Sequence, residues 1–335
     1  MSKIKKTSCI SVALLYILIY LFPASAQELL LTGKDTITFI HVTDPHVCNL
    51  TGFHPFFVQK RQHFGNNFEP LSNFFKSIPE KYKSDFVVIT GDNIDYYEAQ
   101  AESGGTMDNQ IEQYARLIES SKVPVYLTLG NHDIASYYVG PDLTYTNNQL
   151  NAVRARAAWM RNVNSFRDGT YYSHLFKIDT TDFRFIFLDN AYYGTKEIKD
   201  EVLPFLIDPA QLLWLDAQLK ASPDDIEIVF MHMPISHDKP GSNTSEPLAT
   251  YSSKGKFFNL FSVLGRNSST RLFFVGHNHE NIITNYILPN GNKLTQVMTG
   301  AFGYNPNDWR MIKLTNNKIF IYYSGSSKIE YIIPL

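Results

Sequence analysis

The chain has 335 residues, and 44% of them are hydrophobic, which is enough for a substantial core and excludes an intrinsically disordered chain. Its formal net charge of −2 provides no basic attraction toward nucleic acid or an anionic membrane. We therefore expect a folded protein of one large domain or two small ones, with no nucleic-acid binding.

The N-terminus has the three parts of a secretory signal peptide. Lysines precede the apolar run 12–22, and an A-x-A cleavage site ends at Ala26. The run is shorter than the ~20 residues that span a bilayer, so no transmembrane anchor is expected. We predict a signal peptide over residues 1–26, a mature domain over residues 27–335, and export to the periplasm or the extracellular space. Cys48 is then the one remaining cysteine, so no intramolecular disulfide is expected.

Seven apolar runs predict strands, and several are continuous enough to be buried on both faces. In chain order they cover residues 36–44, 85–92, 123–132, 171–178, 183–190, 226–234 and 270–279. Helical spacing predicts helices over 108–121 and 208–222, the second with Asp208 as its N-cap. Asn290-Gly291 and Asn316-Asn317 predict β-hairpins. This pattern predicts one α/β domain in which two sheets pack face to face with helices outside.

Polar side chains gather where five of these runs end. They are Asp44, His46, Asp92, Asn131, His132, Asp133, His232, His277 and His279. Ligands of open α/β sheets bind beyond the carboxyl ends of the strands, so these side chains are expected at one rim. Oxygen and imidazole donors without thiolates suit Mn, Fe or Zn. So many donors exceed the needs of one ion, and we predict two divalent metal ions that share one carboxylate.

The motifs Asp-Pro-His, Gly-Asp-Asn, Gly-Asn-His-Asp, a lone His after Ile-Val-Phe-Met, and Gly-His-Asn-His occur in that order. This order resembles the five sequence blocks of the calcineurin-like metallophosphoesterase superfamily, from about residue 36 to about residue 280. The resemblance implies a metallophosphoesterase-like two-sheet β-sandwich flanked by helices, in four layers (α/β/β/α).

The resemblance also implies a ligand set for each metal ion. One ion would be held by Asp44, His46, Asp92 and His279. Asp92 would bridge to the other ion, whose remaining ligands would be Asn131, His232 and His277. A metal-bound hydroxide would attack the phosphorus directly, with the two ions clamping the attacking and leaving oxygens.

Two further residues are expected to take part in catalysis. His132 would donate a proton to the leaving oxygen or stabilise charge on the phosphoryl group. Asp133 would orient His132. His41 and His174 are expected to be packed, hydrogen-bonded residues outside the site. His54, His63 and His237 lie in loops, where they either line the substrate site or are exposed to solvent.

The residues after the second block distinguish branches of the superfamily. The stretch 91–99 has no Arg, which disfavours a protein Ser/Thr phosphatase, and Asp95 replaces the iron-ligating Tyr of purple acid phosphatases. The Asp-x-His and Gly-Asn-His-Asp motifs are most similar to class III cyclic-nucleotide phosphodiesterases and sphingomyelinase-like members. Tyrosines that follow the second and third blocks could also stack on a substrate ring: Tyr96, Tyr97, Tyr137 and Tyr138.

We therefore predict an exported phosphodiesterase that acts on nucleotide or lipid-headgroup diesters. A phosphomonoesterase of the acid-phosphatase type is the alternative, followed by a non-catalytic binding module on the same fold. The sequence leaves open the natural phosphate ester, the native metals and the oligomeric state.

Overall fold

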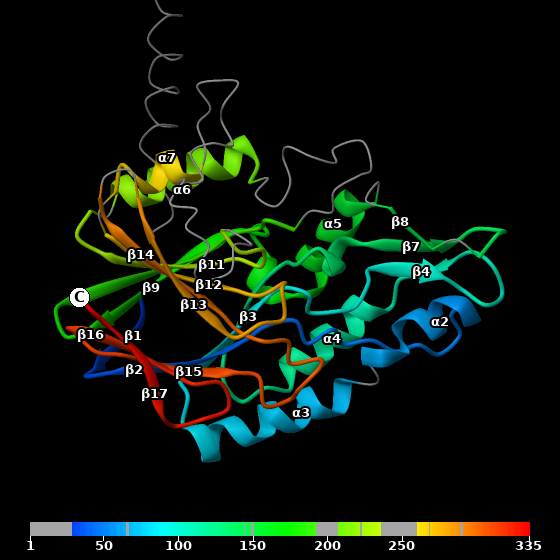
Figure 1. The fold of residues 1–335 in the computed structure, drawn as a ribbon, viewed down its shortest axis with the longest axis horizontal. Helices are drawn as coiled ribbons and strands as arrows, with labels where there is room; N and C mark the ends of the chain where they lie inside the picture. Colours follow the sequence, from blue (N-terminus) through cyan, green and yellow to red (C-terminus); the bar gives the residue numbers. More distant parts are fainter. Residues whose placement is uncertain are drawn as a thin grey trace, which may run out of the picture.

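The computed structural model describes residues 29–64, 67–143, 145–148, 151–191, 207–221, 223–235, 260–267, 269–288 and 291–335 (Figure 1). The predicted signal peptide, residues 1–26, lies outside these described residues, as do His237 and Asn290. Among the described residues, no helix has the length and apolar character needed to cross a membrane.

Two large sheets form the centre of the molecule. The first has seven strands in the order β1 (Leu29–Lys34), β9 (Tyr172–Ile178), β10 (Thr181–Phe187), β11 (Ile226–Phe230), β12 (Thr270–Val275), β14 (Lys293–Met298) and β13 (Ile282–Ile287). The second has six, in the order β17 (Ile329–Pro334), β16 (Lys318–Tyr322), β15 (Arg310–Leu314), β2 (Ile37–Val42), β3 (Phe86–Thr90) and β6 (Val125–Thr128). All seven predicted strands are present, although each is shorter than its apolar run.

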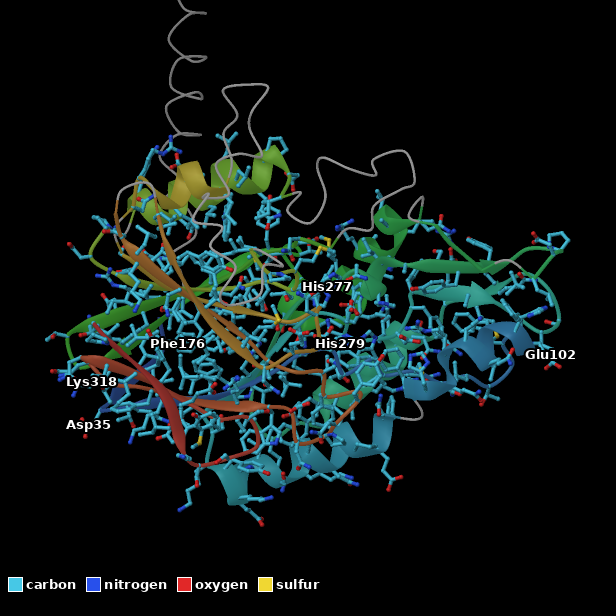
Figure 2. All side chains as sticks on the ribbon, viewed as in Figure 1. Asp35, Glu102, Phe176, His277, His279 and Lys318 are labelled. Atoms are coloured by element: carbon cyan, nitrogen blue, oxygen red, sulfur yellow. The ribbon has the colours of Figure 1, made fainter. Side chains whose placement is uncertain are left out.

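The sheets pack face to face through side chains that alternate along each strand. In β2, Ile37 and Phe39 point between the sheets, whereas Ile40 and Val42 point toward the helices on the outer face. The other central strands follow the same two-residue period, even where every position is apolar. Figure 2 shows Phe176 among the side chains that fill this interior. In a strand that is covered on both faces, successive side chains still point to opposite faces of the sheet. The sequence does not show this alternation, because the residues on both faces are apolar.

Helices cover the outer face of each sheet. On the six-stranded sheet lie α3 (Phe68–Ser77), α4 (Gln110–Glu119) and α5 (Ala152–Asn162). On the seven-stranded sheet lie α6 (Pro209–Ala221) and α7 (Leu260–Leu264), on the opposite side of the molecule from α3 (Figure 1). The described residues also contain short helical turns: η1 (Gln62–Phe64), η2 (Ile78–Tyr82), η3 (His132–Ile134) and η4 (Asn164–Phe166). The predicted four-layer α/β/β/α arrangement is confirmed.

The local signals read from the sequence have the expected geometry. The Asp208 carboxylate accepts hydrogen bonds from the backbone N–H groups of Ala210 and Gln211, so it caps α6. Strands β15 and β16 pair antiparallel around Asn316-Asn317, and β13 pairs antiparallel with β14 next to Gly291. Both hairpin predictions are therefore confirmed by the strand pairing.

A third, small sheet was not predicted. Its order is β5 (Thr106–Met107), β4 (Glu98–Gln100), β7 (Ser136–Val139) and β8 (Tyr145–Asn148), and it lies beside helix α2 (Pro55–Arg61). Three of the tyrosines considered for substrate stacking are buried: Tyr96, Tyr97 and Tyr137. They pack into the molecule, so a stacking role for these three is wrong.

Phe39 gives a direct test of the packing between the sheets. Its fully buried ring contacts the rings of Phe86, Phe185, Phe230 and Phe274 at centroid distances of 5.3–5.8 Å. Phe39→Ala should lower the free energy of unfolding by about 3–5 kcal/mol, because it removes a large buried ring and leaves a cavity. Ile287→Ala, at a side chain that is 65% exposed, should change it by less than about 0.5 kcal/mol. Denaturant unfolding measures both, and equal losses would contradict this description of the core.

Candidate metal centre

The five strand ends that carry the predicted site residues meet at one edge of the sheets. β2, β3 and β6 are parallel neighbours, and so are β11 and β12 in the other sheet. The two sheets are joined at this edge by the backbone N–H of His277, which donates to the Asp44 carboxylate over 3.0 Å. Figure 2 labels His277 and His279 at this junction, away from the core residue Phe176.

The backbone at this edge is held in an unusual conformation. Eight non-glycine residues of the described chain have a positive φ, and five of them are predicted metal ligands: Asp44, His46, Asp92, His277 and His279. A left-handed conformation costs non-glycine residues roughly 1–3 kcal/mol each and concentrates at functional sites. The fold therefore tolerates strain here in order to aim these side chains at a common point.

The glycines in three blocks are required for space. A Cβ on Gly276 would lie 1.8 Å from Thr43 Oγ1, and one on Gly130 would lie 2.2 Å from the backbone nitrogen of Asp92. Gly91 has a φ of +76°, and a Cβ there would meet the His232 ring at 2.5 Å. Strand ends can pack this closely only when no side chain stands between them.

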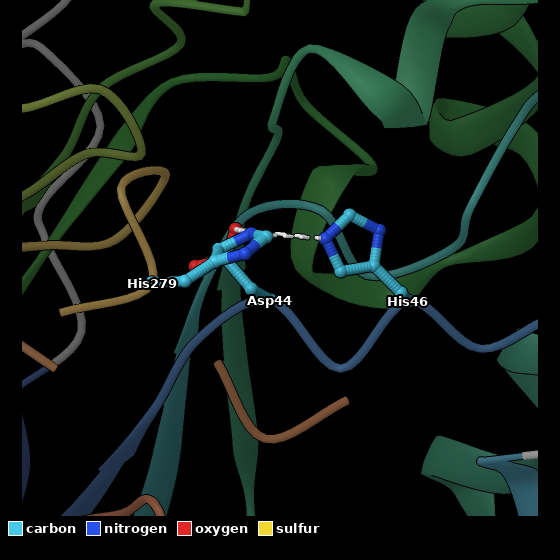
Figure 3. A group of neighbouring side chains, drawn as sticks. All are labelled: Asp44, His46 and His279. Carbon is cyan, nitrogen blue, oxygen red and sulfur yellow. Dashed lines mark hydrogen bonds and ion pairs between the residues drawn. The ribbon is translucent and has the colours of Figure 1, made fainter. Parts of the chain in front are cut away.

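One group of possible ligands consists of Asp44, His46 and His279. Their side chains converge (Figure 3). The Asp44 Oδ1 atom lies 3.3 Å from His279 Nε2 and 3.8 Å from His46 Nε2, and the two Nε2 atoms are 3.4 Å apart. These separations allow one cation to contact all three side chains.

A second group consists of Asp92, His232 and His277. His232 Nε2 lies 3.2 Å from Asp92 Oδ2, 3.3 Å from His277 Nδ1 and 3.0 Å from Asn131 Oδ1. The opposite ring nitrogen of His232 donates to the Thr90 carbonyl over 2.9 Å, so Nε2 is the nitrogen that faces this group. Asn131 is thereby brought to the same point as the second group.

The Asp92 carboxylate lies between the two groups. Its Oδ2 atom is 3.2 Å from His232 Nε2 and 3.7 Å from His46 Nε2. Its Oδ1 atom accepts a hydrogen bond from the backbone N–H of His132 over 2.8 Å, which fixes the carboxylate. Asp92 is therefore the side chain that two neighbouring cations could share.

The donors have the chemistry that a cation requires. Asp44 Oδ1 is buried, and among the described residues it accepts no well-aligned hydrogen bond; it faces the Nε2 atoms of His279 and His46 at 3.3 and 3.8 Å. Burial opposes the charge on His232, but the carboxylates of Asp92 and Asp44 outweigh it and raise the His232 pKa to about 9. Burial likewise opposes the charge on Asp92, yet His232 and His132 hold the Asp92 pKa well below its usual range. This edge of the sheets therefore stabilises positive charge, and divalent ions fit the residues present.

Asp95 and Arg61 support the first group and were not predicted as site residues. The buried Asp95 carboxylate contacts His46 Nδ1 at 3.1 Å and accepts hydrogen bonds from the Arg61 guanidinium. Burial opposes its charge, but Arg61 and His46 hold its pKa below the ordinary range. A carboxylate on the far nitrogen of a metal-binding His fixes the ring and increases its basicity. The feature of the sequence that could have revealed this supporting role is an acidic residue, Asp95, three positions after the predicted ligand Asp92.

His132 lies beside the metal ligands, with its side chain 14% exposed. Its Nδ1 atom is 2.9 Å from the Asp95 carbonyl oxygen, so Nδ1 carries the hydrogen, and it is 3.1 Å from the Tyr137 hydroxyl. Burial is the main cause that lowers the pKa of His132 to about 4. The nearby Asp92 carboxylate acts to raise this pKa, and His46 acts to lower it. Proton donation from Nε2 therefore requires that the negative charge of a bound ester offset this burial.

Asp133 is placed differently from its expected role. Its carboxylate accepts hydrogen bonds from the backbone N–H of Ile94, the backbone N–H of Gly130 and the Asn93 amide, over 2.7–2.9 Å. Asp133 therefore holds together the turns after β3 and β6. The ring of His132 is oriented by Asp95 and Tyr137, and this replaces the expectation that Asp133 orients it.

The packed histidines also have clear partners. His41 is fully buried, and its ring nitrogens contact the hydroxyls of Thr299 and Thr90, each at 2.8 Å. Burial is the main cause that lowers the pKa of His41 to about 3, so the ring is neutral. His174 packs against Tyr126 on β6. Neither residue belongs to the ligand groups described above.

The model of the family described as calcineurin-like phosphoesterase matches residues 37–281. The chain belongs to this family. The match supports a metal-dependent phosphoric ester hydrolase with two metal ions, in agreement with the two groups of ligands. No curated protein sequence matches the chain.

Solved structures share the fold at low sequence identity. A dimetal phosphatase from Danio rerio is 15% identical, with a TM-score of 0.55, covering 89% of this chain and 98% of that one. GAP50, described as the anchor in the inner membrane complex of Plasmodium, is also 15% identical, with a TM-score of 0.52 and coverage of 90% and 89%. PhoD is 12% identical, with a TM-score of 0.52 and coverage of 90% and 69%. At these identities the likeness concerns the fold.

The role of Asp95 can be tested by metal titration. Asp95→Asn should weaken the binding of Mn²⁺ to the metal-stripped protein by about 10- to 100-fold, because His46 loses the charge that fixes its ring. Calorimetric titration gives the affinity, and thermal unfolding shows whether the variant is folded. Glu112→Gln, at an exposed position of α4, is the matched control. Unchanged Mn²⁺ affinity in a folded Asp95→Asn variant would rule out this role.

Proposed function

We propose that the protein is an exported phosphodiesterase with a dinuclear metal centre, acting on nucleotide or lipid-headgroup diesters. Asp44, His46, Asp92 and His279 hold one ion, and Asn131, His232 and His277 complete the second site with Asp92 shared. Mn, Fe and Zn suit these oxygen and imidazole donors. Export is inferred from the N-terminal segment that ends at Ala26.

The observation that carries the proposal is the position of Asp92. Its carboxylate oxygen Oδ2 faces histidines from both ligand groups, at 3.2 and 3.7 Å. A shared carboxylate between two groups of donors is the arrangement that a two-ion phosphoryl-transfer site needs. The buried Oδ1 atom of Asp44, which faces the Nε2 atoms of His279 and His46 at 3.3 and 3.8 Å, supports the same conclusion.

The side chains of the protein would perform distinct tasks. Bound divalent ions supply a water of lowered pKa and neutralise charge on the phosphoryl oxygens. His132, held at Nδ1 by the Asp95 carbonyl, turns its Nε2 atom to the leaving oxygen and stabilises the charge that develops there. Asp95 and Arg61 keep His46 in place, and Asp133 fixes the turn that presents Asn131 and His132.

Two features support a diester over a monoester substrate. The Asp-x-His and Gly-Asn-His-Asp motifs resemble those of phosphodiesterases. Arg61, whose side chain is 13% exposed, directs Nε and one NH2 group at the Asp95 carboxylate, so less of its charge is available for the dianion of a monoester. A phosphomonoesterase is the alternative, and a binding role is the third candidate because GAP50, with the same fold, is described as an anchor.

Removing the shared carboxylate tests the enzyme proposal. The metal-stripped protein is reloaded with Mn²⁺, Zn²⁺ or Fe²⁺ and assayed with bis(p-nitrophenyl) phosphate and p-nitrophenyl phosphate. Turnover should require metal, favour the diester in kcat/KM, and fall to background in Asp92→Ala, because both ions lose a ligand. The control is Asp182→Ala, which should retain activity. Asp182 lies at the N-terminal end of β10, whereas the metal-binding residues lie at the carboxyl ends of the strands.

The other outcomes of this assay separate the candidates. Preference for the monoester would replace the proposal by the phosphomonoesterase. Absence of turnover with either ester, in protein shown to bind two metal ions, would refute the proposed activity on such esters and favour the binding role.

His132 is tested by the dependence on the leaving group. His132→Ala should lower kcat by about 10²- to 10⁴-fold for a diester that releases an alkoxide, since such an oxygen needs a proton. The loss should be smaller for p-nitrophenolate, which leaves as a stable anion. Metal content, measured by elemental analysis, should not change. Equal losses for both leaving groups would exclude a proton-donor role.

A further inference from the structure

The segment that follows β14 is fastened directly to the first metal-binding block. The backbone N–H groups of Phe302 and Gly303 donate to the carbonyls of Thr43 and Asp44 over 3.0 and 2.9 Å. A Cβ on Gly303 would lie 2.9 Å from the carbonyl oxygen of Pro45, so this close approach requires glycine. The next residue along the chain, Tyr304, is therefore held at a defined position relative to Asp44.

Tyr304 lies at the end of a row of aromatic rings that begins at the metal ligands. Its centroid is 5.0 Å from that of His279 and 4.9 Å from that of Phe64. Phe64 in turn stacks on His46 at 4.0 Å, with 20° between the ring planes. Tyr304 is 55% exposed, whereas Phe64 is 4% exposed. The row thus presents the Tyr304 ring to solvent beside a predicted ligand.

His63 extends this exposed aromatic surface. Its ring is nearly parallel to that of Tyr304, with 23° between the planes and 6.1 Å between the centroids. His63 is also exposed. Isolated exposed apolar residues are common on proteins and need no function. Tyr304 differs because its backbone neighbours are bonded to the metal-binding block and its ring contacts His279.

We propose that Tyr304 determines specificity by stacking on a flat ring of the ester, namely a nucleobase. This inference rests on the proposed function, because it takes the phosphate to be held at the two ligand groups. An aromatic face binds any base through its π surface, and each such contact contributes a substantial part of the affinity. The surface therefore selects nucleotide esters from the two classes of diester considered above.

The charges around the ring disfavour the other class. Aromatic rings can also enclose a quaternary ammonium group such as choline, but this requires faces that surround the cation and carry no competing positive charge. The guanidinium carbon of Arg61 already lies 4.9 Å from the Phe64 centroid, and Phe64 is buried. Tyr304 and His63 lie nearly parallel to each other and do not surround a common point.

Tyr304 lies outside residues 37–281, the part of the chain that the family model matches. All the predicted metal ligands lie within that range, so the family model covers them. The stacking residue comes from a segment beyond it. The proposed preference is thus a property of this chain's C-terminal part.

Equilibrium binding tests the proposal without requiring turnover. The full chain, loaded with Mn²⁺, is titrated calorimetrically with P-methylphosphinate analogues of the phosphodiesters of adenosine, ribose and choline. In these probes carbon replaces both ester oxygens, so each carries the single charge of a diester and is not hydrolysed. The adenosine compound should bind at least about five-fold more tightly than the ribose compound, because it alone adds a base. Tyr304→Leu should remove this advantage, since it keeps an apolar side chain without a flat face. Tyr304→Phe should preserve it.

The outcomes distinguish this inference from the proposed function. Equal affinity for the adenosine and ribose compounds, or an advantage that survives Tyr304→Leu, would overturn the stacking role even if the protein hydrolyses diesters. Tightest binding of the choline compound would also overturn it. Hydrolysis of bis(p-nitrophenyl) phosphate is assayed in the same preparation, so a loss of the proposed activity is detected separately from a loss of base recognition.

Discussion

The structure depends on two buried carboxylates, Asp44 and Asp92, at the edge where the sheets meet. Each is at most 1% exposed. Burial of ionised carboxylates is strongly unfavourable unless positive charge lies close to them. The surrounding histidines supply part of this charge, as the raised pKa of His232 and the depressed pKa of Asp92 show. Divalent ions held by these carboxylates and histidines would satisfy the same need more fully.

Much of the surrounding architecture serves to bring these charges together. Glycines at positions 91, 130 and 276 allow the strand ends to approach within distances that a methyl group would prevent. Left-handed backbone at five ligand positions turns the side chains inward. The local strain is sustained by a rigid support, in which Phe39 and its aromatic neighbours fill the space between the sheets. Precise placement of ligands therefore has its origin in the packing of the core.

The sequence predicted those parts of the fold that follow from continuous local patterns. Apolar runs located the seven strands, and polar residues at their ends located the ligand groups, because parallel strands deliver their carboxyl ends to one edge. The small sheet of β4, β5, β7 and β8 was missed because its strands are two to four residues long. Asp133 was misread because adjacency in the chain does not show which way a carboxylate points. Tyr304 was overlooked because its position near His279 depends on contacts that are distant in the sequence. The residues before it, Phe302 and Gly303, make backbone hydrogen bonds to Thr43 and Asp44, more than 250 positions earlier in the chain.

In the proposed function, chemistry and selectivity come from different levels of the structure. The metal-binding side chains stand at the ends of buried strands, where core packing fixes them and where few alternatives are sterically possible. Tyr304 lies on the connection that follows β14 and is 55% exposed, so its side chain can change with less disturbance of the core. A scaffold of this kind can retain one phosphoryl-transfer centre while the connections alter what is bound next to it. In the proposed function, the buried charge of Asp44 and Asp92 would define the reaction, and the neighbouring aromatic surface would define the substrate.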